Sequence, residues 1–268
     1  MSCLVAALPM YDWPEMRAET DAFWARACAA LRRAGIDAPA RLARRNADLP
    51  AVPGGIRDAQ GRPVAPDPAT LPPEAFDLSA LWRHPRLLVG QTCWGPMEAG
   101  LRDHVQVVGQ PDYSAHEGGE GALYSSAIVM RRGEAPIVAA PAEGCARLPL
   151  ALMRGRRLAY NDALSMSGLL ALERDLLAAG EGPAFFAQRI ETGSHRAAAL
   201  AVAEGRADVC ALDCRTWALV RRFLPQADGL VAAGWTARRK GLPLVTARAT
   251  PPEQLAVLRR VLGAFPSP

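Results

Sequence analysis

Residues 158–179 read LAYNDALSMSGLLALERDLLAA, and this stretch decides the fold class. The apolar triplet Leu158–Tyr160 predicts a short buried strand, and Asn161 with Asp162 predicts the turn that ends it. Leu169–Ala179 then has the apolar spacing of a helix. Because a strand that runs through a polar turn into a helix is the repeating unit of α/β proteins, the stretch predicts an α/β fold.

The same order of elements recurs along the chain. Cys3–Leu8 predicts a strand, and 15–34 predicts a helix that ends at Gly35. Further strands are expected at 86–89, 105–108, 125–129, 209–212 and 242–247, and further helices at 197–203, 217–223 and 251–262. This alternation favours parallel sheets. Residues 50–73 hold seven of the 23 prolines, so we expect an exposed excursion without regular elements there.

Composition excludes several classes of function. The chain has 268 residues and a net charge of +4, and its basic residues are scattered, so no nucleic-acid footprint is present. The six cysteines form no CxxC pair, which predicts free buried thiols and no metal site. Neither a Walker lysine nor a glycine-rich nucleotide fingerprint occurs, so no cofactor is expected.

The N-terminal residues and the apolar runs bear on the compartment. Met1–Leu8 is apolar but lacks a preceding basic region and a small-residue cleavage site, so it does not predict a secretory signal. No run reaches the length of a transmembrane helix. On these observations we expect a chain that does not insert into a membrane and that is cytoplasmic as written.

The turn at 165–168 is the first candidate binding site. Ser165, Met166 and Ser167 lie where a predicted strand end meets the first turn of a helix. Helix N-terminal N–H groups and serine hydroxyls together form a site for an anion. The alternative is that a serine here only caps the helix, and on the residues alone capping is the favoured interpretation.

Polar residues follow other predicted strands as well. Ser194 and His195 precede a second helix, and Asp213 closes a strand, although each could equally cap a helix. Residues after further strands are candidates for the same cleft; these are Tyr11, Gln91, Thr92 and Tyr113. No G-x-S-x-G motif supports a hydrolase, and nothing local makes Cys93 a nucleophile.

Taken together, these motifs resemble the phosphate/phosphonate-type substrate-binding proteins of ABC transporters. The resemblance rests on the order of several segments: the strand end Leu8–Asp12, then Leu87–Cys93, Gly109–Tyr113, Tyr124–Val129, the serine turn 165–168, Gly193–His195 and Ala207–Asp213. It covers nearly the whole chain apart from the proline-rich excursion.

The resemblance implies a two-lobed type II periplasmic-binding-protein fold with a hinge and an interlobe cleft. Lobe 1 would be 1–112 plus 240–268, and lobe 2 would be 120–234, with hinges near 113–119 and 235–239. In such relatives the serine turn holds phosphoryl oxygens, a tyrosine matching Tyr124 faces the cleft, and a carboxylate matching Asp213 takes a ligand amine. Met166 replaces a residue that is commonly a hydroxyl, and Trp94 stands where glycine is expected.

The resulting hypothesis is a non-catalytic protein that captures a small phosphate- or phosphonate-like anion for an ABC-transporter permease. The resemblance implies a periplasmic location, which conflicts with the missing signal. The alternative is a cytoplasmic enzyme on the same scaffold that acts on a small biosynthetic metabolite, with His195, Cys93 or Asp213 as acid or base. A ligand-sensing regulator is a third class, but no DNA-binding helix pair is attached.

Overall fold

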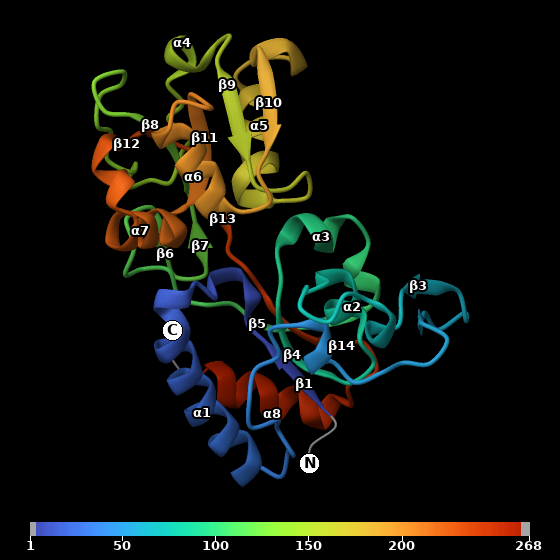
Figure 1. Cartoon of the computed structure of the whole chain (residues 1–268). Coiled ribbons are helices and arrows are strands. Elements are labelled where there is room, and N and C mark those ends of the chain that lie inside the picture. The colour runs from blue at the N-terminus through green and yellow to red at the C-terminus, as the bar shows by residue number, and fades with distance from the viewer. Residues whose placement is uncertain (1–3, 264–268) are drawn as a thin grey trace. The chain divides into compact units, whose positions relative to one another are not determined.

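The computed structural model describes residues 4–263. The chain divides into two compact units, unit 1 from Met1–Pro111 with Leu242–Pro268 and unit 2 from Asp112–Gly241 (Figure 1). It therefore passes twice between the units. The lobe boundaries and hinge segments expected from the sequence stay predictions.

Unit 1 is built on a four-stranded sheet. Its order is β1 (Val5–Ala7), β4 (Leu87–Gln91), β14 (Leu244–Ala247) and β5 (Val105–Gly109). β1 and β4 are parallel, whereas β14 is antiparallel to both of its neighbours. The expectation of parallel sheets is therefore wrong for β14, which returns from unit 2 and enters the sheet in the opposite direction.

Helices cover both faces of this sheet. On one face, α1 (Arg17–Arg33) and α8 (Pro252–Gly263) lie side by side and bury Trp24 and Leu258 (Figure 1). On the other face, α2 (Leu78–Arg83) and α3 (Trp94–Glu98) bury Leu81 and Met97. Short 3-10 turns occur at Pro9–Tyr11, Pro14–Met16, Asn46–Asp48, Pro68–Thr70 and Leu101–Asp103.

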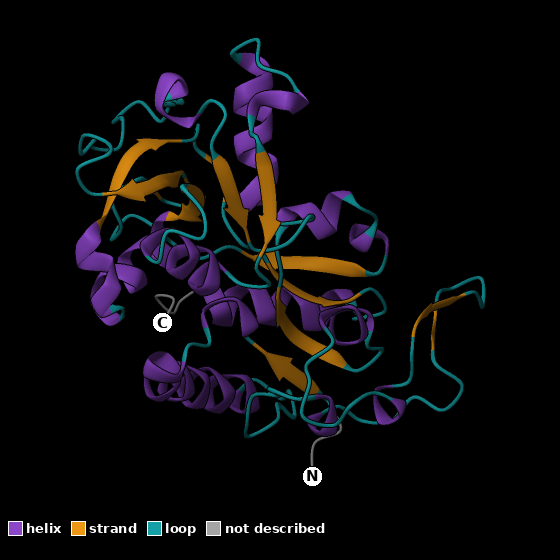
Figure 2. Cartoon of the chain, turned by 45° about the horizontal axis from the view of Figure 1, so that its top comes forward, coloured by secondary structure: helices purple, strands orange, loops and turns teal. Residues whose placement is uncertain are grey.

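The proline-rich excursion is not free of regular structure, so that expectation is wrong. β2 (Ile56–Arg57) pairs antiparallel with β3 (Pro63–Ala65) in a small hairpin away from the main sheet (Figure 2). Ile56 is 2% exposed and β3 contacts α2, so the hairpin packs on the unit. Pro63 is accommodated because a two-stranded hairpin has open edges that need no N–H from it.

Unit 2 is built on a five-stranded mixed sheet. Its order is β10 (Gln188–Glu191), β9 (Arg157–Tyr160), β11 (Val209–Asp213), β8 (Ser126–Arg131) and β12 (Leu230–Trp235). β10, β9 and β11 run parallel, and β8 is antiparallel to β11 and to β12. The predicted parallel arrangement is therefore present only in the first three strands.

The helices of unit 2 follow its parallel strands. A π-helical turn at Met166–Leu170 leads into α5 (Ala171–Ala178), while α6 spans His195–Ala203 and α7 spans Cys214–Phe223. The remaining elements are α4 (Leu150–Met153), the 3-10 turns Pro183–Phe185 and Pro225–Gly229, and a small sheet of β13 (Arg239–Lys240), β7 (Leu123–Tyr124) and β6 (Gly119–Glu120).

The cysteines and the helix lengths bear on two further expectations. The described cysteines are free thiols, but Cys145 is exposed, so the prediction of buried thiols is wrong there. Cys3 lies outside the described residues. Within residues 4–263, no helix combines the length and the apolar character needed to span a membrane.

Candidate functional site

Three helices of unit 2 begin at one edge of its sheet. β10, β9 and β11 are adjacent and parallel, so their carboxyl ends lie at the same edge. Each strand leads within a few residues into a helix, and these are α6, the π-turn before α5, and α7. Three sets of N-terminal N–H groups therefore lie close together, and their dipoles favour a negative charge at this edge.

Each of these helices is capped by a predicted site residue. Ser165 Oγ accepts the N–H of Gly168 at 3.1 Å, and Ser194 Oγ accepts the N–H of Ala197 at 3.1 Å. Asp213 Oδ1 accepts the N–H of Thr216 at 2.9 Å. Capping, the alternative considered for all three residues, is thus their role in the fold.

Ser167, which caps nothing, contacts His195 across the cluster. Its Oγ lies 2.9 Å from His195 Nε2, and the same nitrogen lies 3.7 Å from Asp213 Oδ2. Ser167 and Asp213 are each 2% exposed. We call Ser165, Ser167, His195 and Asp213 the serine–histidine cluster. The three predicted turns of unit 2 therefore converge, although the role of each residue toward a ligand stays a prediction.

The geometry of His195 differs from that of a catalytic triad. A triad needs the hydroxyl and the carboxylate on opposite ring nitrogens, whereas here both approach Nε2. Burial lowers the pKa of His195, and the charge of Asp213 and a backbone hydrogen bond with Ala211 oppose this only in part. The ring is therefore neutral at pH 7, and it can donate one hydrogen bond and accept one.

Buried polar atoms without a protein partner surround the cluster. Among residues 4–263, Asn161 Oδ1 and Ser126 Oγ are buried and make no hydrogen bond. Ser126 faces Asp213 across the β8–β11 pair. Because such atoms are normally satisfied, their gathering at one sheet edge indicates a place for a polar ligand. Asn161 and Ser126 were not among the predicted site residues, and the only sequence signal was their position beside strand ends.

Met166 and Gly168 complete the turn. Met166 is 3% exposed, so its side chain packs inward. A Cβ at Gly168 would lie 1.9 Å from Asn161 Oδ1 and 3.0 Å from His195 Cε1. Glycine at 168 therefore lets the two polar side chains approach the backbone of the turn.

The two predicted tyrosines of unit 2 pack on each other. The rings of Tyr113 and Tyr124 meet edge to face, with 5.1 Å between their centroids. Tyr113 is fully buried and Tyr124 is 2% exposed. A Cβ at Gly241 would fall 2.2 Å from Tyr113 Cε2, so glycine is required beside this ring. Contact of either tyrosine with a ligand stays a prediction.

The predicted residues of unit 1 lie at the carboxyl ends of two parallel strands. Tyr11 follows β1, and Gln91 and Thr92 stand at the end of β4. The Gln91 carbonyl accepts Trp82 Nε1 at 2.9 Å, which anchors the strand end. Thr92 Oγ1 is buried and has no hydrogen-bond partner in the described part of the chain, as at the unit 2 site.

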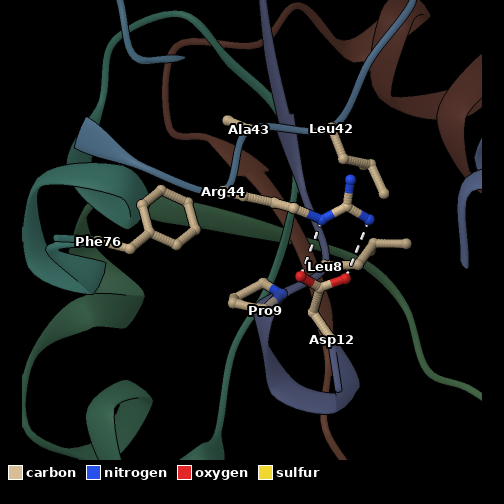
Figure 3. A pocket seen from close by; sticks show the side chains of 7 residues that line it. All are labelled: Leu8, Pro9, Asp12, Leu42, Ala43, Arg44 and Phe76. Carbon is tan, nitrogen blue, oxygen red and sulfur yellow. Dashed lines mark hydrogen bonds and ion pairs between the residues drawn. The ribbon is translucent and has the colours of Figure 1, made fainter. Parts of the chain in front are cut away.

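A pocket of about 120 Å³ lies beside the turn after β1 (Figure 3). Arg44 donates to both carboxylate oxygens of Asp12, at 2.8 and 3.0 Å, and also pairs with Asp21. The hydrogen bond to Asp12 raises the pKa of Arg44. The guanidinium thus fixes the turn to the 42–44 segment, a contact that spans 32 residues and that the sequence did not indicate.

Comparison with known proteins assigns the class and then the family. The fold resembles that of PhnD1 from Prochlorococcus marinus, solved with methylphosphonate, with a TM-score of 0.63 and 14% identity over 96% of this chain and 82% of that one. XAC2383 from Xanthomonas citri, bound to chloride, matches with a TM-score of 0.60 and 19% identity, over 99% of this chain and 86% of that one. A binding protein component of an ABC phosphonate transporter from Pseudomonas aeruginosa matches with a TM-score of 0.60 and 18% identity, over 96% of this chain and 72% of that one. The chain therefore has the two-lobed type II periplasmic-binding-protein fold, as predicted.

The family follows from the sequence match. Residues 95–267 match the family model of the phosphonate periplasmic substrate-binding proteins of ABC transporters. The chain belongs to this family, which confirms the predicted resemblance, and it is a non-catalytic solute-binding component rather than an enzyme. No curated protein sequence matches it significantly. Nothing supports the alternative of a biosynthetic enzyme.

Proposed function

We propose that this chain captures a small phosphonate- or phosphate-like anion at the serine–histidine cluster and delivers it to an ABC-transporter permease. One observation carries the proposal. The buried Ser167–His195 contact of 2.9 Å lies where three helices begin, among buried polar atoms without protein partners. A ligand oxygen there would supply the hydrogen bonds that the protein leaves unmade.

The chemistry of the cluster suits an anion held by neutral donors. Serine hydroxyls, the neutral His195 ring and first-turn N–H groups can each donate to an oxyanion, and three helix dipoles add a favourable field. Specificity for tetrahedral oxyanions would come from the positions of these donors. The structure of PhnD1 with methylphosphonate supports this ligand class, as does family membership.

We expect Asp213 to act mainly by holding the start of α7 in place, and less by contacting the ligand. Its Oδ1 accepts the Thr216 N–H and its Oδ2 accepts the Thr216 hydroxyl at 2.6 Å. A ligand amine would have to share these oxygens. We therefore expect ligands without an amine to bind at least as well as aminoalkyl phosphonates.

The experiment is isothermal titration calorimetry with methylphosphonate and inorganic phosphate. We expect saturable binding with one site, and we expect Ser167→Ala to weaken it at least ~10-fold, because loss of a buried charge-assisted hydrogen bond costs about 1.5 kcal/mol or more. Thr70→Val is the control, since Thr70 is exposed in unit 1 and its hydroxyl only donates to the Asp67 carbonyl at 2.8 Å. That variant should bind like the wild type.

Two results would overturn the proposal. One is the absence of binding to every phosphonate and phosphate tried, and the other is unchanged affinity in Ser167→Ala. The predicted contribution of unit 1 is tested separately with Thr92→Val, which removes the partnerless hydroxyl and keeps the shape. If Thr92 contacts the ligand, this variant lowers the affinity and leaves the fold intact.

A further inference from the structure

A second pocket in unit 1 lies at the opposite edge of the sheet from Tyr11 and Thr92. Its volume is about 630 Å³. It lies beside the amino ends of β4 and β5 and the carboxyl end of β14, and residues of the β2–β3 hairpin line it as well. The residues that define it, which we call the arginine pocket, include Arg57, Arg62, Arg83, Asp103, His104 and Arg248.

The lining of the arginine pocket carries an excess of positive charge. Four arginines face two aspartates, and Asp58 is already bound by Arg62 Nε at 2.7 Å. His84 adds no charge, because its Nδ1 accepts the Arg86 N–H and its burial lowers its pKa. The remaining guanidiniums therefore outnumber the carboxylates.

These guanidiniums use few of their donors on the protein. Arg83 Nη1 donates to Ser79 Oγ at 2.8 Å, and Arg57 Nη1 donates to the Gly61 carbonyl at 2.8 Å. Among residues 4–263, neither these arginines nor Arg248 forms an ion pair. Each guanidinium has five N–H donors in a planar fork, which matches carboxylate and phosphate oxygens.

Arg83 distinguishes this pocket from an ordinary basic surface. It is only partly exposed, and desolvation lowers its pKa, with the charge of Asp77 opposing this. A cation that has lost part of its hydration and that forms no direct ion pair with a carboxylate is stabilised by an anion from outside. The hairpin carries Arg57 toward the same space, so a ligand would be held from two elements.

We propose that the arginine pocket binds a small molecule that carries two or more phosphate or carboxylate groups. Its volume falls in the range of organic ligands and is much larger than a single phosphate requires. Because four arginines line the pocket, pairing of their charges with an anionic ligand supplies the affinity. This site is separate from the serine–histidine cluster, because the pocket lies at the sheet of unit 1 and the cluster lies at the sheet of unit 2.

The test is calorimetric titration of the full chain with pyrophosphate and, separately, with citrate, at low salt. We expect saturable binding of at least one of them, weakened at least ~10-fold in Arg83→Gln/Arg248→Gln. The control Arg26→Gln/Arg33→Gln removes the same charge from the exposed face of α1 and should change the affinity less than ~2-fold. Whichever anion binds more tightly identifies the ligand as a phosphate or a carboxylate compound.

Further variants separate this proposal from the proposed function. Ser167→Ala should leave pyrophosphate or citrate binding unchanged. If Arg83→Gln/Arg248→Gln fails to fold by circular dichroism, Arg57→Gln/Arg248→Gln replaces it, since both side chains are exposed. Failure of both anions to bind, equal loss in the control, or loss in Ser167→Ala alone would each refute the arginine pocket.

Discussion

Gly168→Ala tests whether the candidate site is packed as described. An alanine methyl carbon at 168 would lie 1.9 Å from Asn161 Oδ1, whereas real contacts of this kind are almost never shorter than 3.0 Å. The Asn161 amide must therefore move by at least ~1.1 Å, and His195 Cε1 at 3.0 Å limits the space on the other side. Overpacking of this kind costs about 1–3 kcal/mol.

Urea unfolding followed by circular dichroism measures this cost. At an m-value of about 2 kcal/mol/M, a loss of about 2 kcal/mol lowers the unfolding midpoint by about 1 M. We also expect methylphosphonate to bind at least ~10-fold more weakly, because the displaced Asn161 and His195 line the site. Both effects have the same geometric cause, so they should appear together.

Two further variants make the test specific. Gly182→Ala is the control, since Gly182 has a φ of −105° and no atom within 4 Å of an added Cβ. It should be neutral or stabilising by about 0.4–1 kcal/mol. Asn161→Ala combined with Gly168→Ala removes the clash and should recover at least half of the lost stability. Wild-type stability in Gly168→Ala, or no recovery in the double variant, would refute the packing.

Two predictions concern the stability of unit 2 and its thiols. Asp208 accepts hydrogen bonds from Arg157 and Arg131, which hold the pKa of its carboxyl well below its usual range, so its stabilising effect is present above about pH 4 and is lost as the pH falls further. Asp208→Asn should therefore lower the free energy of unfolding by about 2 kcal/mol at pH 7. Urea titrations should show a smaller difference from the wild type at pH 3. Equal differences at both pH values would contradict this. Burial raises the pKa of the Cys210 thiol, whereas Cys145 is exposed. Peptide mapping after brief iodoacetamide treatment of the native protein should find Cys145 alkylated and Cys210 intact, and early alkylation of Cys210 would contradict its burial.

Local elements were predictable where neighbouring residues decide them. The strand 157–160, the polar turn and the helix after Ser165 follow from short-range pattern and capping chemistry, and Ser165 does cap its helix. The order of such elements was enough to predict the α/β class and the family, both of which are confirmed. The π-helical start at Met166–Leu170 was not predicted, because the apolar spacing that indicates a helix does not distinguish a π-turn from an α-helical turn.

Strand direction and partner choice were not predictable in the same way. β8 and β12 are antiparallel to their neighbours, and β12 and β10 were not identified at all. Short apolar runs show that a segment is buried without showing which strand pairs with it. The direction of β14 likewise depends on a return crossing from unit 2.

The residues of the serine–histidine cluster were predictable from the sequence, but the contacts between them were not. The sequence by itself determined which turns carry hydroxyl, imidazole and carboxylate groups, because these groups follow strand ends that local pattern identifies. Only the tertiary structure decided that Ser167 meets His195, 28 residues away, and that Ser126 faces Asp213 from a neighbouring strand. The physical reason is that distances between side chains on different strands are set by backbone pairing and core packing, which involve residues far apart in the chain.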